Sequence, residues 1–247
     1  PFSAPEGERI GEIWFNPPEE LPHVLVKYLY TSQKLSVQVH PSSADACPQE
    51  TGKEECWLVI DAEPGAQLAL GFKAETTPEE VKRAALNGTI EHMLSWYDAK
   101  AGDLFYLPAG TVHAIGAGLS LVEVQQNSDT TFRLYDYGRP RELHLERALA
   151  VADCGPHATE HRRTSAELGQ TLIDGPYFRL DRVVGSPDSL TCAAYDCDLM
   201  ALPLSGEITS KDGAAQARPG ECLYASDISE LDFSQAHITL MTRSARS

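Results

Sequence analysis

The chain has 247 residues, of which 42% are hydrophobic, so it can bury the core of one large or two small domains. Its 36 acidic residues outnumber its 20 Lys and Arg residues, and the formal charge of −16 argues against nucleic acid or an anionic membrane as a partner. Both of those partners require a basic face. The apolar runs are strand-sized, well short of the ~20 residues that a membrane-spanning helix needs.

The six cysteines form no C-x-x-C pair. This usage is typical of a reduced, intracellular protein and disfavours a disulfide framework or a thiolate zinc finger. No secretory signal is visible at the start of the sequence. We therefore expect a cytoplasmic protein, and no pattern in the sequence indicates a protein partner.

Short apolar-alternating runs separated by Gly, Pro and Asp dominate the first half and are typical of an all-β chain. Thr77-Pro78-Glu79-Glu80 interrupts them with an N-cap, a proline at the first helical position and a capping-box acid. It predicts a helix that ends near Gly88, with a second short helix over 90–96. The predicted strands are 24–30, 35–40, 55–61, 67–72, 104–107, 119–125 and 131–137.

A helix is predicted over about 142–152, and the polar segment 153–168 after it is a candidate linker. Lys211-Asp212-Gly213 indicates a hairpin turn in the second half. The strands expected there are 177–185, 190–196, 198–204, 206–210, 221–225 and 237–242. We predict a first β domain over 1–152, with a helical insert at about 77–96, and a second β domain over 169–247.

Two candidate metal ligands lie in residues 35–41, which alternate strictly. Gln38 and His40 share one face of this strand with Ser36, while the other face is apolar. A solvated outer face would give the same pattern. A third candidate is Glu55, which shares a face with Lys53 and Trp57 at the start of a strongly apolar strand. A surface Glu at a strand entry is the alternative for this position.

The strongest single pattern is G-x5-P-x-G-x2-H over 102–113, a spacing known from cupin β-barrels, whose metal ligands line the interior. It would present His113 from the strand after a tight turn. Gln38, His40, Glu55 and His113 together offer two imidazoles, a carboxylate and an amide oxygen. This set suits Zn²⁺, but two His and one carboxylate also describe a non-haem iron site, so the ligands leave the metal open.

Two further strands carry polar residues among apolar ones. Glu123 interrupts the apolar run 119–125, and Arg133 alternates with Tyr135 and Tyr137 on one predicted face. The arginine would then stack on the tyrosines as a structural cation–π element, or join Lys53 in a cationic pocket for an anionic substrate.

Four strings in the chain closely resemble the type I mannose-6-phosphate isomerases, zinc-dependent cupins that interconvert mannose 6-phosphate and fructose 6-phosphate. They are Leu-Ser-Val-Gln-Val-His-Pro (35–41), Gly-Lys-x-Glu-Cys-Trp (52–57), Pro-Ala-Gly-Thr-Val-His-Ala (108–114) and the run Gln-Gln-Asn-Ser-Asp-Thr-Thr-Phe-Arg-Leu-Tyr-Asp-Tyr-Gly-Arg-Pro (125–140). The resemblance runs from about residue 10 to 146. Without a large helical insertion, the chain is similar to the compact bacterial forms.

By this resemblance one Zn²⁺ per chain is held by Gln38, His40, Glu55 and His113. The catalytic residues implied are Arg133, Lys53 and Glu123, and a sugar phosphate is bound with the help of Ser36, Lys53, Arg133 and Tyr135. Residues 170–247 match no quoted string, and Pro219-Gly220 resembles a degenerate cupin turn without a His. The expected fold is therefore mainly β, with two cupin-type jelly-roll barrels, of which the C-terminal one is degenerate and metal-free.

The function implied is aldose–ketose isomerisation by zinc-assisted proton transfer through a cis-enediol. In this chemistry cations stabilise the developing enediolate, and Glu123 is the preferred acid/base. Lys53 or a metal-bound water would serve equally as the base. Two alternatives stay open: an iron-dependent cupin dioxygenase and a non-catalytic cupin that binds sugar phosphates.

Overall fold

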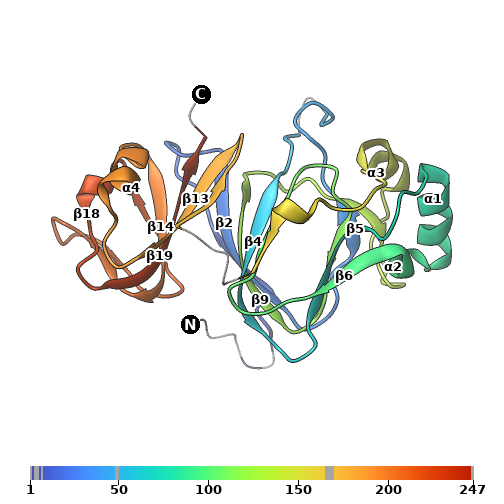
Figure 1. Cartoon of the computed structure of the whole chain (residues 1–247), viewed down its shortest axis with the longest axis horizontal. Helices are drawn as coiled ribbons and strands as arrows, with labels where there is room; N and C mark the ends of the chain where they lie inside the picture. The colour runs from blue at the N-terminus through green and yellow to red at the C-terminus, as the bar shows by residue number, and fades with distance from the viewer. Residues whose placement is uncertain (1, 3–5, 7, 48–49, 165–169, 246–247) are drawn as a thin grey trace. The chain divides into compact units, whose positions relative to one another are not determined.

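A computed structural model describes residues 2, 6, 8–47, 50–164 and 170–245. The chain forms two compact units: residues 28–166, and residues 1–27 together with 167–247 (Figure 1). The chain passes from one unit to the other at two places, between residues 27 and 28 and between residues 166 and 167, the second of them inside the 153–168 segment. Residues 165–168 of that segment, and residue 169, lie outside the described residues. Residues 1–27, assigned from the sequence to the first domain, group with the C-terminal residues.

Two antiparallel sheets hold the candidate ligands, and the mainly β prediction is confirmed. All of their strands lie in residues 28–166 except β1 and the first half of β2. One sheet has the strand order β1-β2-β9-β4-β7-β11 and the other the order β10-β3-β8-β5-β6. Their strands are β1 (Glu12–Phe15), β2 (Val24–Thr31), β9 (Leu119–Gln126), β4 (Glu55–Ala62), β7 (Leu104–Leu107), β11 (Arg162–Arg163), β10 (Phe132–Tyr135), β3 (Val37–Val39), β8 (His113–Ile115), β5 (Gln67–Phe72) and β6 (Leu94–Asp98).

An apolar cluster joins the inner faces of these two sheets. Trp57 and Val59 of β4 contribute to it from one sheet, and Leu70 and Ile115 from the other. The outer face of the second sheet belongs to a separate apolar cluster, which α1 (Pro78–Asn87), α2 (Ile90–Met93) and α3 (Leu145–Val151) cover. Because strand side chains alternate, a polar residue in register with the inner apolar positions must point between the sheets.

The predicted helix after Thr77 is confirmed in detail. The Thr77 hydroxyl accepts the Glu80 N–H, the Glu80 carboxylate accepts the Thr77 N–H, and Gly88 ends the helix in the left-handed region. The helix at about 142–152 is shorter than predicted, because α3 begins only at Leu145. The residue before it, His144, is the N-cap: its carbonyl accepts the Ala148 N–H, while its imidazole and its N–H bond to the backbone of Arg133.

The C-terminal residues form a five-stranded sheet of order β12-β13-β19-β14-β17 and a three-stranded sheet of order β16-β15-β18, around their own apolar core. The segment 190–196, predicted as a strand, is instead the helix α4 (Ser189–Ala194), because the Asp188 carboxylate caps its first turn. The predicted turn at Lys211-Asp212-Gly213 joins β15 to β16, with Gly213 at a φ of 74°. The elements are β12 (Thr171–Asp174), β13 (Phe178–Val184), β14 (Leu199–Gly206), β15 (Ile208–Ser210), β16 (Gln216–Ala217), β17 (Leu223–Ala225), β18 (Leu231–Asp232), β19 (Ala236–Ser244) and the short 3-10 helix η3 (Ile228–Glu230).

No helix among the described residues is both long and apolar enough to cross a membrane. The six cysteines all lie in the described part of the chain, and each carries a free thiol.

The segment after α3 adds an edge strand to the first sheet. It includes η1 (Thr159–His161), and β11 pairs with β7. His157 is 9% exposed, and its Nε2 lies 2.9 Å from the carbonyl oxygen of Tyr106. Its Nδ1 is buried and has no hydrogen-bond partner among the described residues. Desolvation by burial lowers the pKa of His157 to about 4.

This buried imidazole predicts acid sensitivity of folding. Because the unfolded state binds a proton near pH 6.5 and the folded state only near pH 4, the free energy of unfolding should fall as the pH falls through this range. The loss expected is about 2–3 kcal/mol. Urea unfolding of metal-stripped protein at pH 7.5 and pH 4.5 measures it. The variant His157→Asn should lose less stability between these pH values, and an equal loss in both proteins would contradict the prediction.

Candidate metal centre and its surroundings

The four predicted ligands lie in or directly after three strands, which bring them to one place between the sheets. His113 opens β8 and lies directly opposite Gln38 of β3, and His40 follows β3 by one residue. Glu55 opens β4 in the other sheet. Its side chain points inward, because Trp57, two residues later, belongs to the inner apolar cluster. The tight turn predicted at 108–110 ends with Gly110 at a φ of 87°.

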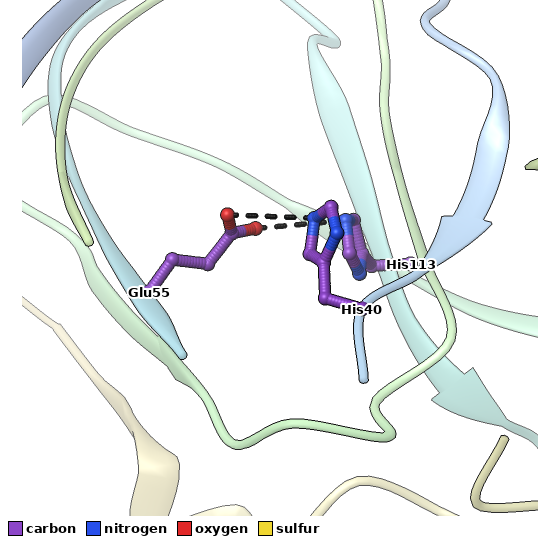
Figure 2. A group of neighbouring side chains, drawn as sticks. All are labelled: His40, Glu55 and His113. Carbon is purple, nitrogen blue, oxygen red and sulfur yellow. Dashed lines mark ion pairs between the residues drawn. The ribbon is translucent and has the colours of Figure 1, made fainter. Parts of the chain in front are cut away.

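The side chains of His40, Glu55 and His113 form a buried cluster whose candidate ligand atoms all lie within 4.8 Å of one another (Figure 2). The two carboxylate oxygens of Glu55 each lie 3.5 Å from a histidine Nε2, Oε2 from His40 and Oε1 from His113. All three residues are at most 2% exposed. This is the only group of three or more His, Cys, Asp or Glu side chains in the described residues that is arranged to hold a metal ion.

The other nitrogen of each imidazole is held by the backbone. His40 Nδ1 lies 2.8 Å from the carbonyl oxygen of Thr130, and His113 Nδ1 lies 2.9 Å from that of Thr111. A carbonyl accepts a hydrogen bond, so it holds the proton on Nδ1 and leaves the Nε2 lone pair for a metal. Burial also lowers the pKa of His113, against the opposing effect of Glu55, which favours the neutral ring that metals require. The donor set therefore fits a divalent cation.

Gln38 stands beside this cluster, with its amide held on one side by Ser36. The Ser36 hydroxyl donates to Gln38 Oε1 at 2.9 Å, and Gln38 Nε2 lies 3.2 Å from His113 Nε2. Amide oxygen and nitrogen are assigned from hydrogen bonds, and a rotation of the amide by 180° exchanges them. Such a rotation would turn the oxygen toward His113 and let the amide nitrogen donate to the serine.

Lys53 lies between two buried carboxylates. Its Nζ is 2.8 Å from Glu55 Oε2 and 3.9 Å from Glu123 Oε1, and its side chain is 7% exposed. It also lies 3.3 Å from His40 Nε2. Lys53 therefore places a positive charge directly beside the candidate metal ligands, within 4 Å of a carboxylate oxygen of both Glu55 and Glu123.

Trp57 contacts two residues of the site, Glu123 and His113, and the sequence analysis gave it no role there. It is fully buried, its indole N–H donates to Glu123 Oε2 at 2.9 Å, and its ring meets His113 edge-on at 5.4 Å between centroids. The signal was present in the alternation, because Trp57 shares a face with Glu55. The backbone acceptors at Thr111 and Thr130 had no such signal, since any residue type supplies a carbonyl.

The side chains of Arg133 and Tyr135 lie on opposite faces of the sheet, because β10 has an irregularity between them. Arg133 pairs directly with Gln38, so its side chain lies on the inner face with the ligands. The register shifts between Arg133 and Tyr135, and the Tyr135 ring packs with the outer cluster, where its hydroxyl approaches Gly88 at the end of α1. The expected shared face of Arg133 and Tyr135 is therefore wrong, because a β-bulge interrupts the two-residue period.

Comparison with known proteins finds relatives of this chain. The chain is 42% identical over 209 residues to the mannose-6-phosphate isomerase of Streptococcus mutans, a match that covers 79% of this chain and 65% of that protein. It is 41% identical over 172 residues to the mannose-6-phosphate isomerase ManA of Bacillus subtilis, covering 64% of this chain and 54% of that one. The chain is a homologue of the mannose-6-phosphate isomerases. It spans about half to two thirds of the length of these relatives.

The fold agrees with this relationship. The crystal structure of the mannose 6-phosphate isomerase from Bacillus subtilis is similar with a TM-score of 0.69 and 25% identity, covering 89% of this chain and 74% of that one. A putative mannosephosphate isomerase from Archaeoglobus fulgidus shares the fold with a TM-score of 0.70 at 18% identity. No family model matches the chain.

Proposed function

We propose that this chain is an aldose–ketose isomerase that interconverts mannose 6-phosphate and fructose 6-phosphate. The observation that carries the proposal is the buried His40, Glu55 and His113 cluster with Lys53 beside it, in a chain about 40% identical to proteins named for that reaction. We assign catalysis to the predicted first domain, and propose that the second carries no metal. Free thiols at all six cysteines support a cytoplasmic location.

We propose Zn²⁺ as the ion, held by His40, Glu55 and His113 with Gln38 as a fourth ligand. Two imidazole nitrogens and a carboxylate are preferred zinc ligands. Zinc has no redox chemistry, so when bound it would orient and polarise substrate oxygens without oxidising the sugar. The Lys53 ammonium, 2.8 Å from Glu55 in this structure, would then move away from the carboxylate toward the substrate.

Proton transfer requires a base for the C2–H of the open-chain sugar, and we assign this role to Glu123. Its Oε2 accepts the indole N–H of Trp57, and its Oε1 lies 3.9 Å from the Lys53 ammonium; the carboxylate would take the proton from C2 and return it to C1. Between the two steps the sugar is a cis-enediol. The electrons of the C2–H bond form its C1–C2 double bond, while the electrons of the C1=O π bond move to O1, which takes up a proton. When C1 is protonated, O2 gives up its proton and the C2=O bond forms.

Lys53 and Arg133 supply the positive charge that this chemistry and an anionic substrate both require. A fixed cation lowers the energy of a developing enediolate most strongly where water is excluded, as it is around the buried Lys53. Ser36, 2% exposed and bonded to the Gln38 amide, would orient this ligand while the sugar is bound. We leave Tyr135 out of this set, because it packs with the outer cluster.

A coupled assay of mannose 6-phosphate conversion tests the proposal on protein stripped with EDTA, with and without added Zn²⁺. Activity should disappear on stripping and return with zinc. No isomerisation with any metal, together with oxygen consumption in the presence of Fe²⁺, would favour a dioxygenase. Folded, zinc-loaded protein that binds sugar phosphates by calorimetry without converting them would be a binding protein, and either result would reject the isomerase.

A further inference from the structure

Arg133 lies on a strand with an open edge, and a single residue closes that edge. β10 is the terminal strand of its sheet, so one side of its backbone has no neighbouring strand. His144 takes that place at Arg133: the Arg133 N–H donates to His144 Nδ1 at 3.1 Å, and the His144 N–H donates to the Arg133 carbonyl at 2.8 Å. Both backbone groups of Arg133 on this side are thus held by one residue.

The guanidinium of Arg133 is anchored by the same segment. Its Nη1 donates to the carbonyl oxygen of Glu142 at 3.0 Å. Its Nε is buried and has no hydrogen-bond partner among the described residues. A buried donor without a partner costs about 1–3 kcal/mol, so this N–H is available to an oxygen that arrives from outside the protein. The anchor at Glu142 fixes where that donor lies.

The segment from β10 to α3, residues 136–144, is itself locked by a buried carboxylate. Asp136 is 2% exposed and accepts hydrogen bonds of 2.6 to 3.0 Å from the side chains of Arg139 and Arg141. Between them Tyr137 adopts a φ of 55°, which is strained for a residue with a side chain. These charged bonds hold the return of the chain, and with it Glu142 and His144, against β10.

We propose that His144 is a positioning residue for Arg133, and that the 136–144 segment exists to aim the Arg133 guanidinium at a substrate oxygen. The imidazole does not touch the substrate; it fixes the strand edge from which Arg133 projects. This inference rests on the proposed function, because it assumes that Arg133 acts on the sugar phosphate.

A double-mutant cycle in the zinc-loaded enzyme separates positioning from general stability. His144→Ala should lower kcat by about 10-fold or more, because a misplaced catalytic group costs up to about 100-fold. In an Arg133→Ala background the same change should lower kcat less than about twofold, since the residue to be positioned is gone. His144→Asn, whose amide oxygen can accept the Arg133 N–H, should recover most of the loss. The exposed His237→Ala is the matched control and should leave kcat unchanged.

A readout without catalysis keeps this inference separate from the proposed function. The Arg133 Nε–H resonance, assigned by its absence in Arg133→Lys, should be ordered in nitrogen relaxation of the wild type and of His144→Asn, and mobile in His144→Ala. An unchanged kcat in His144→Ala, an equal loss in the Arg133→Ala background, or an ordered resonance in His144→Ala would each overturn the inference. If the wild type proves not to be an isomerase, the proposed function fails, and the relaxation data alone decide whether His144 positions Arg133.

Discussion

Replacing Glu55 by Gln should remove tight metal binding and lower kcat for mannose 6-phosphate isomerisation by about 1,000-fold or more. The carboxylate faces both imidazoles, with one oxygen 3.5 Å from each Nε2, so it is the one anionic group in the candidate ligand cluster. The amide that replaces it is neutral and binds a cation more weakly than the carboxylate does. Removing a residue that only hydrogen-bonds to a metal ligand typically lowers metal affinity by about 10- to 100-fold, so removing the ligand itself should lower it further. Metal content after dialysis and kcat with added zinc measure both effects.

The neighbouring Glu54→Gln is the matched control. The Glu54 carboxylate bonds to the Tyr106 hydroxyl, away from the ligands, so metal content and kcat should stay within about twofold of the wild type. Glu55→Gln also leaves the buried Lys53 without its nearest carboxylate, which is expected to destabilise the fold by about 3 kcal/mol or more. Circular dichroism must therefore show a folded variant, and His113→Asn provides a second test of the same centre. Full metal content in a folded Glu55→Gln would show that the ion lies elsewhere.

The part of this centre that the sequence predicted follows from the two-residue alternation of side chains along a strand. Alternation put Gln38 and His40 on one face and Glu55 with Trp57 on another, and the Gly110 turn fixed where His113 emerges. Those inferences are local, since each depends on residues adjacent in the chain. That the three strands meet between two sheets is not local, and it came from the resemblance of four strings to a known family.

The expectations that failed did so where a specific contact overrode a local pattern. Tyr135 was expected to share a face with Arg133. The bulge in β10 instead places its ring in the outer cluster. Residues 190–196 alternate enough for a strand, but the Asp188 cap gives the segment a helical start. His144 had no recognisable spacing, because its partner is the backbone of Arg133, eleven positions earlier. Backbone partners leave no pattern of side-chain types to find.

Replacing Arg133 by Ala should lower kcat by about 100- to 1,000-fold and leave metal content unchanged, because the guanidinium is outside the candidate ligand cluster. It shares the inner face with Gln38, and its buried Nε has no partner among the described residues. That donor is what an oxygen with developing negative charge would use, so the loss should appear in kcat more than in KM. The exposed Arg83→Ala on α1 changes the net charge equally and should leave kcat unaltered.

Added guanidinium at millimolar concentration distinguishes a catalytic cation from a structural one in the Arg133→Ala variant. If the side chain stabilises charge in the transition state, the small cation should enter the space left and restore part of kcat, with an effect that saturates. A purely structural arginine would lower the thermal midpoint in the same variant and give no rescue, because the lost packing and the bond to the Glu142 carbonyl are not replaced by a free ion. An unchanged kcat would show that Arg133 takes no part in the reaction. The proposal that His144 and the 136–144 segment position Arg133 for catalysis would then fail as well.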